Sequence, residues 1–337
     1  MWTIKSALEW TQGHLAAKGD TNPRLSAQWL LCAATGLSRL ELYTNYEQVL
    51  PDGQLAVLRD GIKRRVAREP LQYIMGKAPF RKLELVVRQG VLIPRPETEV
   101  LVDIVIAELR RQGDLEFARV LDVCTGTGNI ALSLLHECSW VSVVATDNDP
   151  AAVLLARENA RILGLLEANV SCIACDDGGD IGSGSGGGDT GNSCEDNNRY
   201  NGNSSNRGGC LQIIKDDLAS TIVADPKMHG CFDVVVSNPP YIPTAELEKL
   251  PEEVAAYEPL GALDGGADGL KVFRRIVEQA RALLKPGGLL ACELFETSLD
   301  EATKLCVGKG FNEALIHRDL TNRPRIITAR ATREVSL

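Results

Sequence analysis

The chain lacks several features that would place it at once in a large class of proteins. Its 337 residues contain no run of 18 or more apolar residues, so we expect no membrane-spanning helix and no membrane partner. Basic residues are not in excess, since 36 Lys and Arg stand against 45 Asp and Glu, whereas proteins that bind duplex phosphates are usually basic. We therefore expect no direct nucleic-acid partner. Residues 1–6 hold no apolar segment of a secretory signal, which favours a cytoplasmic location.

Residue types that bind metal ions are few and poorly spaced. The sequence has four histidines, and none of them belongs to a His-Glu-x-x-His pattern. Cys172 and Cys175 form a Cys-x-x-Cys pair, but Cys194 and Cys210 do not supply a second one. A structural zinc site typically uses two such pairs, so we expect no metal.

The first 75 residues have the pattern of a small helical domain. Apolar side chains recur there at steps of three and four residues, and Pro23, Gly36, Ser38 and Pro51 are residue types that begin or end helices. Residues 1–80 carry ten Lys and Arg against seven Asp and Glu. Two interpretations of this basic excess stay open: a solvated helix face, or a docking patch for an acidic or ribonucleoprotein partner. Much of it comes from Lys63, Arg64, Arg65 and Arg68.

The pattern changes at residues 76–93, which we predict to be a hairpin that links two domains. Apolar residues alternate over 83–87, residues 88–90 supply a turn, and 91–93 would form the second strand.

From residue 94 onward, helices alternate with short apolar strands. This order predicts an α/β domain over 94–337, built on a Rossmann-like, parallel, doubly wound sheet with helices on both faces. We expect strands at 120–123, 141–145, 232–236 and 289–294, and helices at 94–111, 129–136, 150–163 and 270–284.

One stretch of this domain has an unusual composition. Residues 176–209 contain 11 Gly, 6 Asn and 5 Ser, with almost no apolar side chains. Such a segment cannot bury enough surface to offset the entropy lost on ordering, so we expect a disordered insertion.

A turn of small residues follows the first strand of the α/β domain: Cys124, Thr125, Gly126, Thr127 and Gly128. Small residues let a ligand approach the backbone, whose free N–H groups point outward at the start of the next helix. The spacing matches neither a P-loop nor Gly-x-Gly-x-x-Gly. The turn therefore predicts a nucleotide-like cofactor or is an ordinary tight turn.

Asp147 ends the next strand, about 20 residues after this turn. A carboxylate at that place can accept hydrogen bonds from both hydroxyls of a ribose. Together with the small-residue turn, it favours a cofactor that contains a ribose, either NAD or S-adenosylmethionine.

Asn238, Pro239, Pro240 and Tyr241 follow a later apolar strand. The prolines remove two backbone donors and stiffen the chain, so carbonyl acceptors remain. Asn238 adds a side-chain acceptor and Tyr241 a flat face. This set suits a planar amino group, because two N–H donors can meet the Asn238 oxygen and a proline carbonyl, which aims the nitrogen lone pair at an electrophile.

These four residues resemble the Asn-Pro-Pro-Tyr motif of S-adenosylmethionine-dependent amino methyltransferases. With further motifs, the chain is identified as a member of the HemK/PrmC family, which methylates the glutamine of the Gly-Gly-Gln motif in peptide chain release factors. The resemblance covers nearly the whole chain except the insertion, and it rests on residues 70–76, 93–99, 237–243, 264–270 and 323–325.

The resemblance implies a protein-glutamine methyltransferase whose helical domain recognises the release factor, with S-adenosylmethionine as cofactor. We also expect a monomer. It implies catalytic roles for Asn238, Pro239, Pro240 and Tyr241. The cofactor would contact Cys124, Thr125, Gly126, Thr127, Gly128, Asp147, Asp217, Leu218 and Asn238.

Two positions, Cys124 and Leu218, depart from the family pattern. Cys124 stands where Gly is usual, so its side chain would narrow the cofactor turn. Asp217 takes the place of the family's acid near the adenine, although Asp216 stays an alternative. Leu218 then stands where an aromatic residue sometimes follows that acid.

Other functions stay open at this point. A sister family methylates a glutamine of a ribosomal protein, but its loop usually reads Pro-Arg-Ser-Pro, unlike residues 94–97. A methyltransferase that acts on amino groups of nucleic acid is a second alternative. The absence of a basic, aromatic-rich target domain from this chain argues against it. A protein of another class, which binds S-adenosylmethionine or a translation factor without catalysis, is the remaining alternative.

Overall fold

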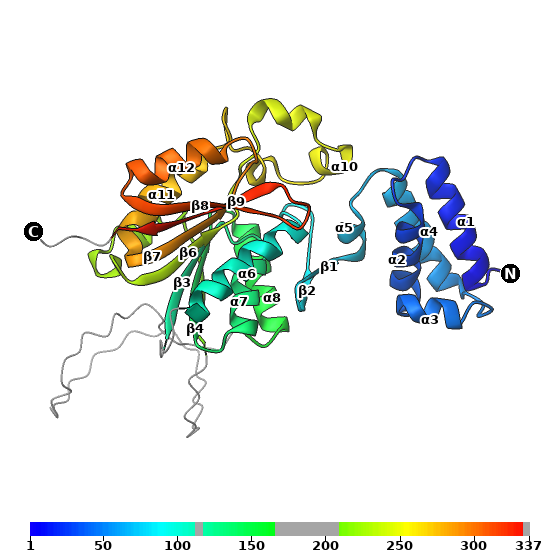
Figure 1. Cartoon of the computed structure of the whole chain (residues 1–337). Helices are drawn as coiled ribbons and strands as arrows, with labels where there is room; N and C mark the ends of the chain where they lie inside the picture. The colour runs from blue at the N-terminus through cyan, green and yellow to red at the C-terminus, as the bar shows by residue number, and fades with distance from the viewer. Residues whose placement is uncertain (112–116, 166–208, 333–337) are drawn as a thin grey trace, which may run out of the picture.

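A seven-stranded sheet forms the centre of the larger part of the molecule (Figure 1). The computed structural model describes residues 1–111, 117–165 and 209–332. The strands of this sheet are β3 (Ala118–Val123), β4 (Val141–Asp147), β5 (Leu211–Lys215), β6 (Phe232–Ser237), β7 (Leu284–Glu293), β8 (Phe311–Arg318) and β9 (Pro324–Ala331). They lie in the order β5-β4-β3-β6-β7-β9-β8. The predicted α/β fold with a Rossmann-like sheet is confirmed.

The sheet is mixed, so the expectation of a parallel sheet is confirmed for β3 to β7 and wrong for β8 and β9. Strands β3 to β7 pair in parallel, but β9 runs antiparallel to both β7 and β8. The last two strands need no helical crossover between them, because antiparallel neighbours can be joined by a short turn. Sequence alternation indicated the parallel part and missed β5, β8 and β9.

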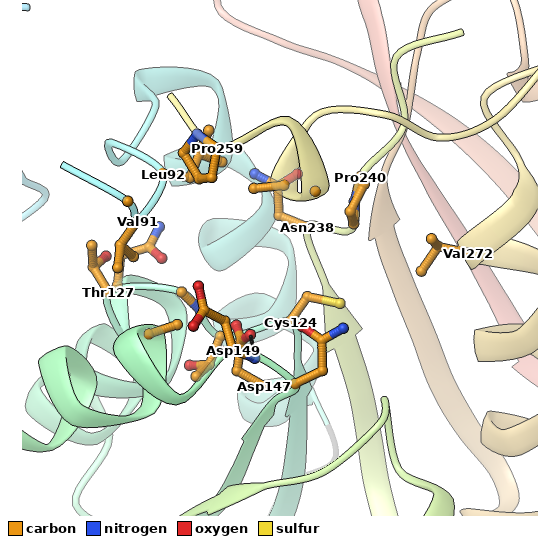
Figure 2. Close-up of a pocket in the computed structure, with 18 of the residues that line it drawn as sticks. Val91, Leu92, Cys124, Thr127, Asp147, Asp149, Asn238, Pro240, Pro259 and Val272 are labelled. Carbon is orange, nitrogen blue, oxygen red and sulfur yellow. Dashed lines mark hydrogen bonds between the residues drawn. The ribbon is translucent and has the colours of Figure 1, made fainter. Parts of the chain in front are cut away.

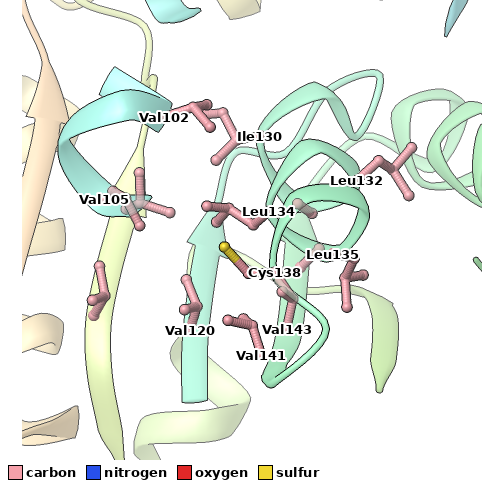
Figure 3. Close-up of a cluster of buried hydrophobic side chains, with 14 of the residues drawn as sticks. Val102, Val105, Val120, Ile130, Leu132, Leu134, Leu135, Cys138, Val141 and Val143 are labelled. Atoms are coloured by element: carbon pink, nitrogen blue, oxygen red, sulfur yellow. The ribbon is translucent and has the colours of Figure 1, made fainter. Parts of the chain in front are cut away.

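Helices cover both faces of the sheet in two buried clusters. One face packs against α6 (Pro96–Arg111), α7 (Asn129–Glu137) and α8 (Pro150–Ile162) (Figure 3). The other packs against α9 (Ser220–Val223), α11 (Lys271–Leu283) and α12 (Leu299–Gly308). Neighbouring strand residues separate accordingly, since Val120 belongs to the first cluster and Leu121 to the second. This alternation is what a strand buried on both faces requires.

The strand order reverses between β3 and β6, and this reversal positions the site. β4 and β5 extend from β3 in one direction, while β6 and β7 extend in the other. The register pairs Val123 with Ser237 and with Thr146, so Cys124, Asn238 and Asp147 follow at the same edge of the sheet. The Ser237 hydroxyl donates to the Val123 carbonyl at 2.6 Å and ties the two strand ends together. Ligands of open α/β sheets bind at such a reversal, outside the carboxyl ends of the strands.

The N-terminal helices form a separate cluster beside the sheet (Figure 1). The helices are α1 (Ile4–Ala17), α2 (Pro23–Thr35), α3 (Arg39–Thr44), α4 (Asp52–Val66) and α5 (Leu71–Met75). The predicted boundary residues have the expected roles. Gly36 ends α2 with a left-handed backbone, and Ser38 caps α3 through its hydroxyl.

A two-stranded hairpin follows α5, but its turn lies elsewhere than predicted. β1 (Lys77–Phe80) pairs with β2 (Leu83–Val86), so the turn is at Arg81 and Lys82 rather than at 88–90. Residues 91–93 form no strand. The alternation over 83–87 was assigned to the first strand and in fact marks the second. Pro79, inside β1, obscured the true first strand.

Arg65, a basic residue in the last turn of α4, joins the two parts of the chain. Arg65 is buried, and its guanidinium contacts Asp20 at 2.6 Å and Glu253 at 2.7 Å. Glu253 belongs to α10 (Glu252–Ala255), and in the same segment the Tyr257 hydroxyl donates to the Ala67 carbonyl at 2.6 Å. Arg65 therefore belongs neither to a solvated face nor to a free docking patch.

The remaining expectations are the absence of a membrane-spanning helix, the absence of a metal site and a disordered segment at 176–209. Within the described ranges, no helix is long and apolar enough to cross a membrane. In the same ranges, no group of three or more His, Cys, Asp or Glu lies together as a metal site would require. Except for Gly209, the segment 176–209 lies outside the described residues, so its disorder stays a prediction.

Candidate active site

A cavity of about 430 Å³ opens at the carboxyl ends of β3, β4 and β6 (Figure 2). Cys124 and Asp147 lie on one side of it, and Asn238 and Pro240 lie across from them (Figure 2). The structure thus gathers most of the residues chosen from the sequence. The predicted residues that line it are Cys124, Thr125, Gly126, Thr127, Asp147, Asp217, Leu218, Asn238 and Pro240. Gly128, Pro239 and Tyr241 do not.

The small-residue turn is held from below by Asp122. This fully buried carboxylate accepts hydrogen bonds from the Thr125 hydroxyl at 2.7 Å and from the Ala131 N–H at 3.2 Å. Burial raises the pKa of Asp122 to about 7. Gly128 begins α7 with φ of +82°, and a Cβ there would lie 3.0 Å from Leu132. Gly128 is therefore required by backbone and packing rather than by contact with the cavity.

Cys124 has a conformation that the sequence did not predict. Its φ is +61°, in the left-handed region that favours glycine. The preference for Gly at this position thus has a backbone cause in addition to the narrowing expected from the side chain. Burial raises the pKa of the Cys124 thiol, which keeps it neutral near pH 7.

Asp147 joins the turn to the end of β4. Its carboxylate accepts the Gly126 N–H at 2.9 Å and the Asp149 N–H at 3.0 Å. Burial raises its pKa. Each carboxylate oxygen has further acceptor capacity, so a ribose can still be bound. Beside it, Thr127 lines the cavity, while its hydroxyl is buried and has no hydrogen-bond partner in the described part of the chain.

Asp217 and Asp216 have different environments. Asp217 lines the cavity and pairs with Arg275 at 2.7 Å, a contact that lowers its pKa. Asp216 is buried and accepts from the Thr221 hydroxyl at 2.7 Å, away from the cavity. Of the two acids, Asp217 therefore faces the cavity. Leu218, with φ of +59°, forms an apolar wall next to it.

Asn238 lies between this cavity and a smaller one of about 120 Å³. The smaller cavity is also lined by Pro239, Tyr241 and Leu263. The Asn238 amide nitrogen donates to the Thr98 hydroxyl at 3.0 Å. The amide oxygen is thereby left to accept a hydrogen bond from a ligand.

Tyr241 is anchored below the smaller cavity. Its hydroxyl donates to Glu293 at 2.9 Å, and burial, reinforced by Glu293, raises its pKa well above the usual value. A neutral phenol held in this way lends its ring to the cavity wall and is not a base.

The segment after Tyr241 forms the outer wall of both cavities. Leu250, Val254 and Ala262 line the smaller one, and Pro259 and Ala262 line the larger. Within this segment, Glu258 accepts two hydrogen bonds from Arg95 at 2.7 and 2.8 Å. The same segment carries Glu253, the partner of Arg65, so the wall is continuous with the helical cluster.

Comparisons with known proteins show which family the chain resembles. The PrmC N-terminal domain matches residues 6–76, and the Methyltransferase small domain matches residues 98–176. The Release factor glutamine methyltransferase of Geobacter sulfurreducens is 37% identical over 330 residues, which cover 98% of this chain and 97% of the relative. That of Moorella thermoacetica is 38% identical over 87% of this chain and 85% of the relative.

The chain belongs to the release factor glutamine methyltransferase family. The similarity to the Geobacter protein extends over nearly the whole chain and includes the helical cluster, the strand-end motifs and the wall segment. As a member of this family the chain is a methyltransferase, which separates it from a dehydrogenase and from a non-catalytic binding module.

Among the residues of this candidate site that sequence reasoning missed are Arg275, Thr98 and Glu293. Arg275 pairs with Asp217, while Thr98 and Glu293 contact the Asn-Pro-Pro-Tyr corner. Glu293 gave a usable signal, because an acid within the predicted apolar strand 289–294 needs a partner. Thr98 lies within residues 93–99, one of the family motifs, but nothing in the sequence shows that its hydroxyl reaches Asn238.

Proposed function

We propose that this chain transfers a methyl group from S-adenosylmethionine to the side-chain amide nitrogen of the glutamine in the Gly-Gly-Gln motif of peptide chain release factors. One observation carries the proposal beyond family membership. The Asn238 amide nitrogen is engaged by Thr98, so its oxygen is left as an acceptor between two adjoining cavities. An acceptor there suits a target that brings N–H donors.

The larger cavity fits S-adenosylmethionine. It offers the Asp147 carboxylate for ribose hydroxyls and the apolar Leu218 beside Asp217 for a base. The backbone of the small-residue turn would hold the remaining polar groups. Acidic side chains around the cavity also complement a ligand with a cationic sulfur. When bound, the cofactor supplies an electrophilic methyl group.

The smaller cavity would hold the target glutamine. The Asn238 oxygen and the Pro239 carbonyl would each accept one amide N–H, and the Tyr241 ring would flank the side chain. Holding both N–H groups draws the amide nitrogen from its planar geometry and directs its lone pair toward the larger cavity. Catalysis is then positioning and electrostatics, and positioning alone can contribute about 7–11 kcal/mol.

The helical part would recognise the release factor at a second place. We assign residues 1–75 to substrate recognition, 76–93 to the linker and 94–337 to the methyltransferase domain. The support is the contact between Arg65 and Glu253, which connects α4 to the wall of the target cavity. A protein held by the helices would thus be oriented with respect to Asn238.

A methylation assay tests the proposal. Purified chain is incubated with labelled S-adenosylmethionine and either a release factor or the same factor with the Gly-Gly-Gln glutamine changed to alanine. Mass spectrometry should place one methyl group on that glutamine and none on the variant. Ribosomal protein and nucleic acid serve as competing substrates, and methylation of either in preference to the release factor would contradict the proposal.

A further inference from the structure

A buried chain of hydrogen bonds connects Asn238 to Glu293. The Asn238 amide nitrogen donates to Thr98 at 3.0 Å, and the Thr98 hydroxyl donates to Glu293 at 2.7 Å. Tyr241 donates to the other oxygen of Glu293 at 2.9 Å. Thr98 is 0% exposed and Glu293 is 1% exposed, so water does not compete for these groups. The network joins the first turn of α6 to the ends of β6 and β7.

The protons in this network can be arranged in one way when Glu293 is ionised. A carboxylate has no proton, so both hydroxyls must donate to it. Thr98 has a single hydroxyl proton, and once this is given to Glu293, Thr98 can only accept from Asn238. The amide of Asn238 therefore turns its nitrogen to Thr98 and its oxygen to the cavities.

The groups that act on Glu293 come from three other parts of the fold. Burial and the nearby Glu97 raise its pKa, while the hydroxyls of Thr98 and Tyr241 and the charge of Arg325 act in the opposite direction. These groups lie on α6, on the loop after β6 and on β9. Burial has the largest effect, and the pKa of Glu293 is raised overall. The two hydroxyls aimed at its oxygens and the Arg325 charge act against burial and stabilise the carboxylate form that the proton arrangement requires.

We propose that Thr98 and Glu293 are positioning residues that fix which end of the Asn238 amide faces the target, and so make the site select glutamine over glutamate. This inference rests on the proposed function. A fixed oxygen accepts an N–H of glutamine and repels a carboxylate. An amide free to turn would offer its N–H group to glutamate, so the discrimination would fall.

Thr98→Val and Thr98→Ser test the inference. Valine has nearly the shape of threonine but neither donates nor accepts, whereas serine keeps the hydroxyl. Affinity is measured for a release factor and for its Gly-Gly-Gln glutamine-to-glutamate variant, with S-adenosylhomocysteine present. For Thr98→Val we expect the glutamine-over-glutamate preference and kcat each to fall about tenfold, with S-adenosylhomocysteine affinity unchanged, and we expect Thr98→Ser to stay within about twofold of the wild type.

Two further variants separate positioning from stability. Val105→Ala removes a buried side chain from the same helix without touching the network, so it should lower the melting temperature and keep the preference. Glu293→Gln keeps the shape but adds an N–H donor, which lets Thr98 turn its proton toward Asn238. It should lower the preference as Thr98→Val does, and it decides the matter if the valine variant does not fold.

The outcomes separate a failure of the proposed function from a failure of the positioning role of Thr98 and Glu293. If the wild type neither methylates the release factor nor prefers the glutamine form, the proposed function fails. If the wild type does both and the folded Thr98→Val and Glu293→Gln variants keep its preference and kcat, the proposed function stands and the positioning inference is wrong.

Discussion

Two strand ends meet at the site, and they are shaped by different means. At the end of β3, the chain is bent by its backbone: Cys124, Gly126 and Gly128 all have positive φ. At the end of β6, Asn238 is fixed by side-chain hydrogen bonds to Thr98 and onward to Glu293. The difference follows from the ligand that each would bind. A cofactor can be held by backbone groups of a tight turn, whereas selecting one target atom needs a side chain whose orientation is set.

This comparison predicts that side-chain changes at the β6 end affect turnover most. Asn238→Ala removes the acceptor that would hold the target amide. We expect kcat to fall at least about a hundredfold, as when one preorganised polar contact is removed from a reacting centre. S-adenosylmethionine affinity, measured by calorimetry, should change less, because the lost contact belongs to the reacting geometry. An equal loss in both quantities would place Asn238 mainly in cofactor binding.

At the β3–β4 side, the same kind of change should affect cofactor affinity. Asp147→Ala removes a half-buried carboxylate from the cavity floor, and a hydrogen bond to a charged group contributes about 1.5–3 kcal/mol. Calorimetry should show S-adenosylmethionine binding weakened about tenfold or more. Asp225→Ala is the control, since Asp225, like Asp147, accepts the backbone N–H two residues further on but lies outside the cavity. Unchanged affinity in Asp147→Ala would contradict the ribose assignment.

The buried acid below the turn should make stability depend on pH. The pKa of Asp122 is raised from 3.8 to about 7, so between these values the folded state binds more protons than the unfolded state. Its contribution to stability is therefore present at low pH and is lost as pH rises toward 7. Asp122→Asn cannot ionise. Its melting temperature relative to the wild type should rise between about pH 4 and 7 and level off above this range. A difference independent of pH would show that Asp122 does not titrate in this range.

The smallest effect concerns the strained residue of the turn. With φ of +61°, any side chain at Cys124 costs about 1–2 kcal/mol compared with glycine. Cys124→Gly removes this strain, whereas Cys124→Ala keeps it and loses the sulfur. Denaturation should show the glycine variant about 1 kcal/mol more stable than the alanine variant, the reverse of their order in a helix. The glycine variant should bind S-adenosylmethionine as tightly as the wild type or more tightly. A large loss of this affinity would contradict the hypothesis that the Cys124 side chain narrows the turn.

Local patterns were sufficient to predict much of the fold. The periods of β3, β4, β6, α7 and α8, and the residues that begin or end α2, α3 and α4, depend on near neighbours in the chain. The hairpin turn was misplaced because Pro79 interrupts β1. The edge strand β8 was missed because exposed residues such as Leu315 and Ile316 weaken the alternation. The fate of Arg65 could not be predicted, since its partner Glu253 lies 188 positions away in the chain.

The sequence by itself determined which residues stand at the strand ends, because the type of each element and the residue that ends it follow from local spacing. Cys124 to Gly128, Asp147 and Asn238 to Tyr241 were found in this way. The tertiary structure alone decided what holds them. Thr98 is 140 positions from Asn238 and 195 from Glu293, and the three meet because the sheet places β6 beside β7 and α6 packs its first turn over their ends. Such contacts depend on closing the whole sheet, which no local pattern encodes.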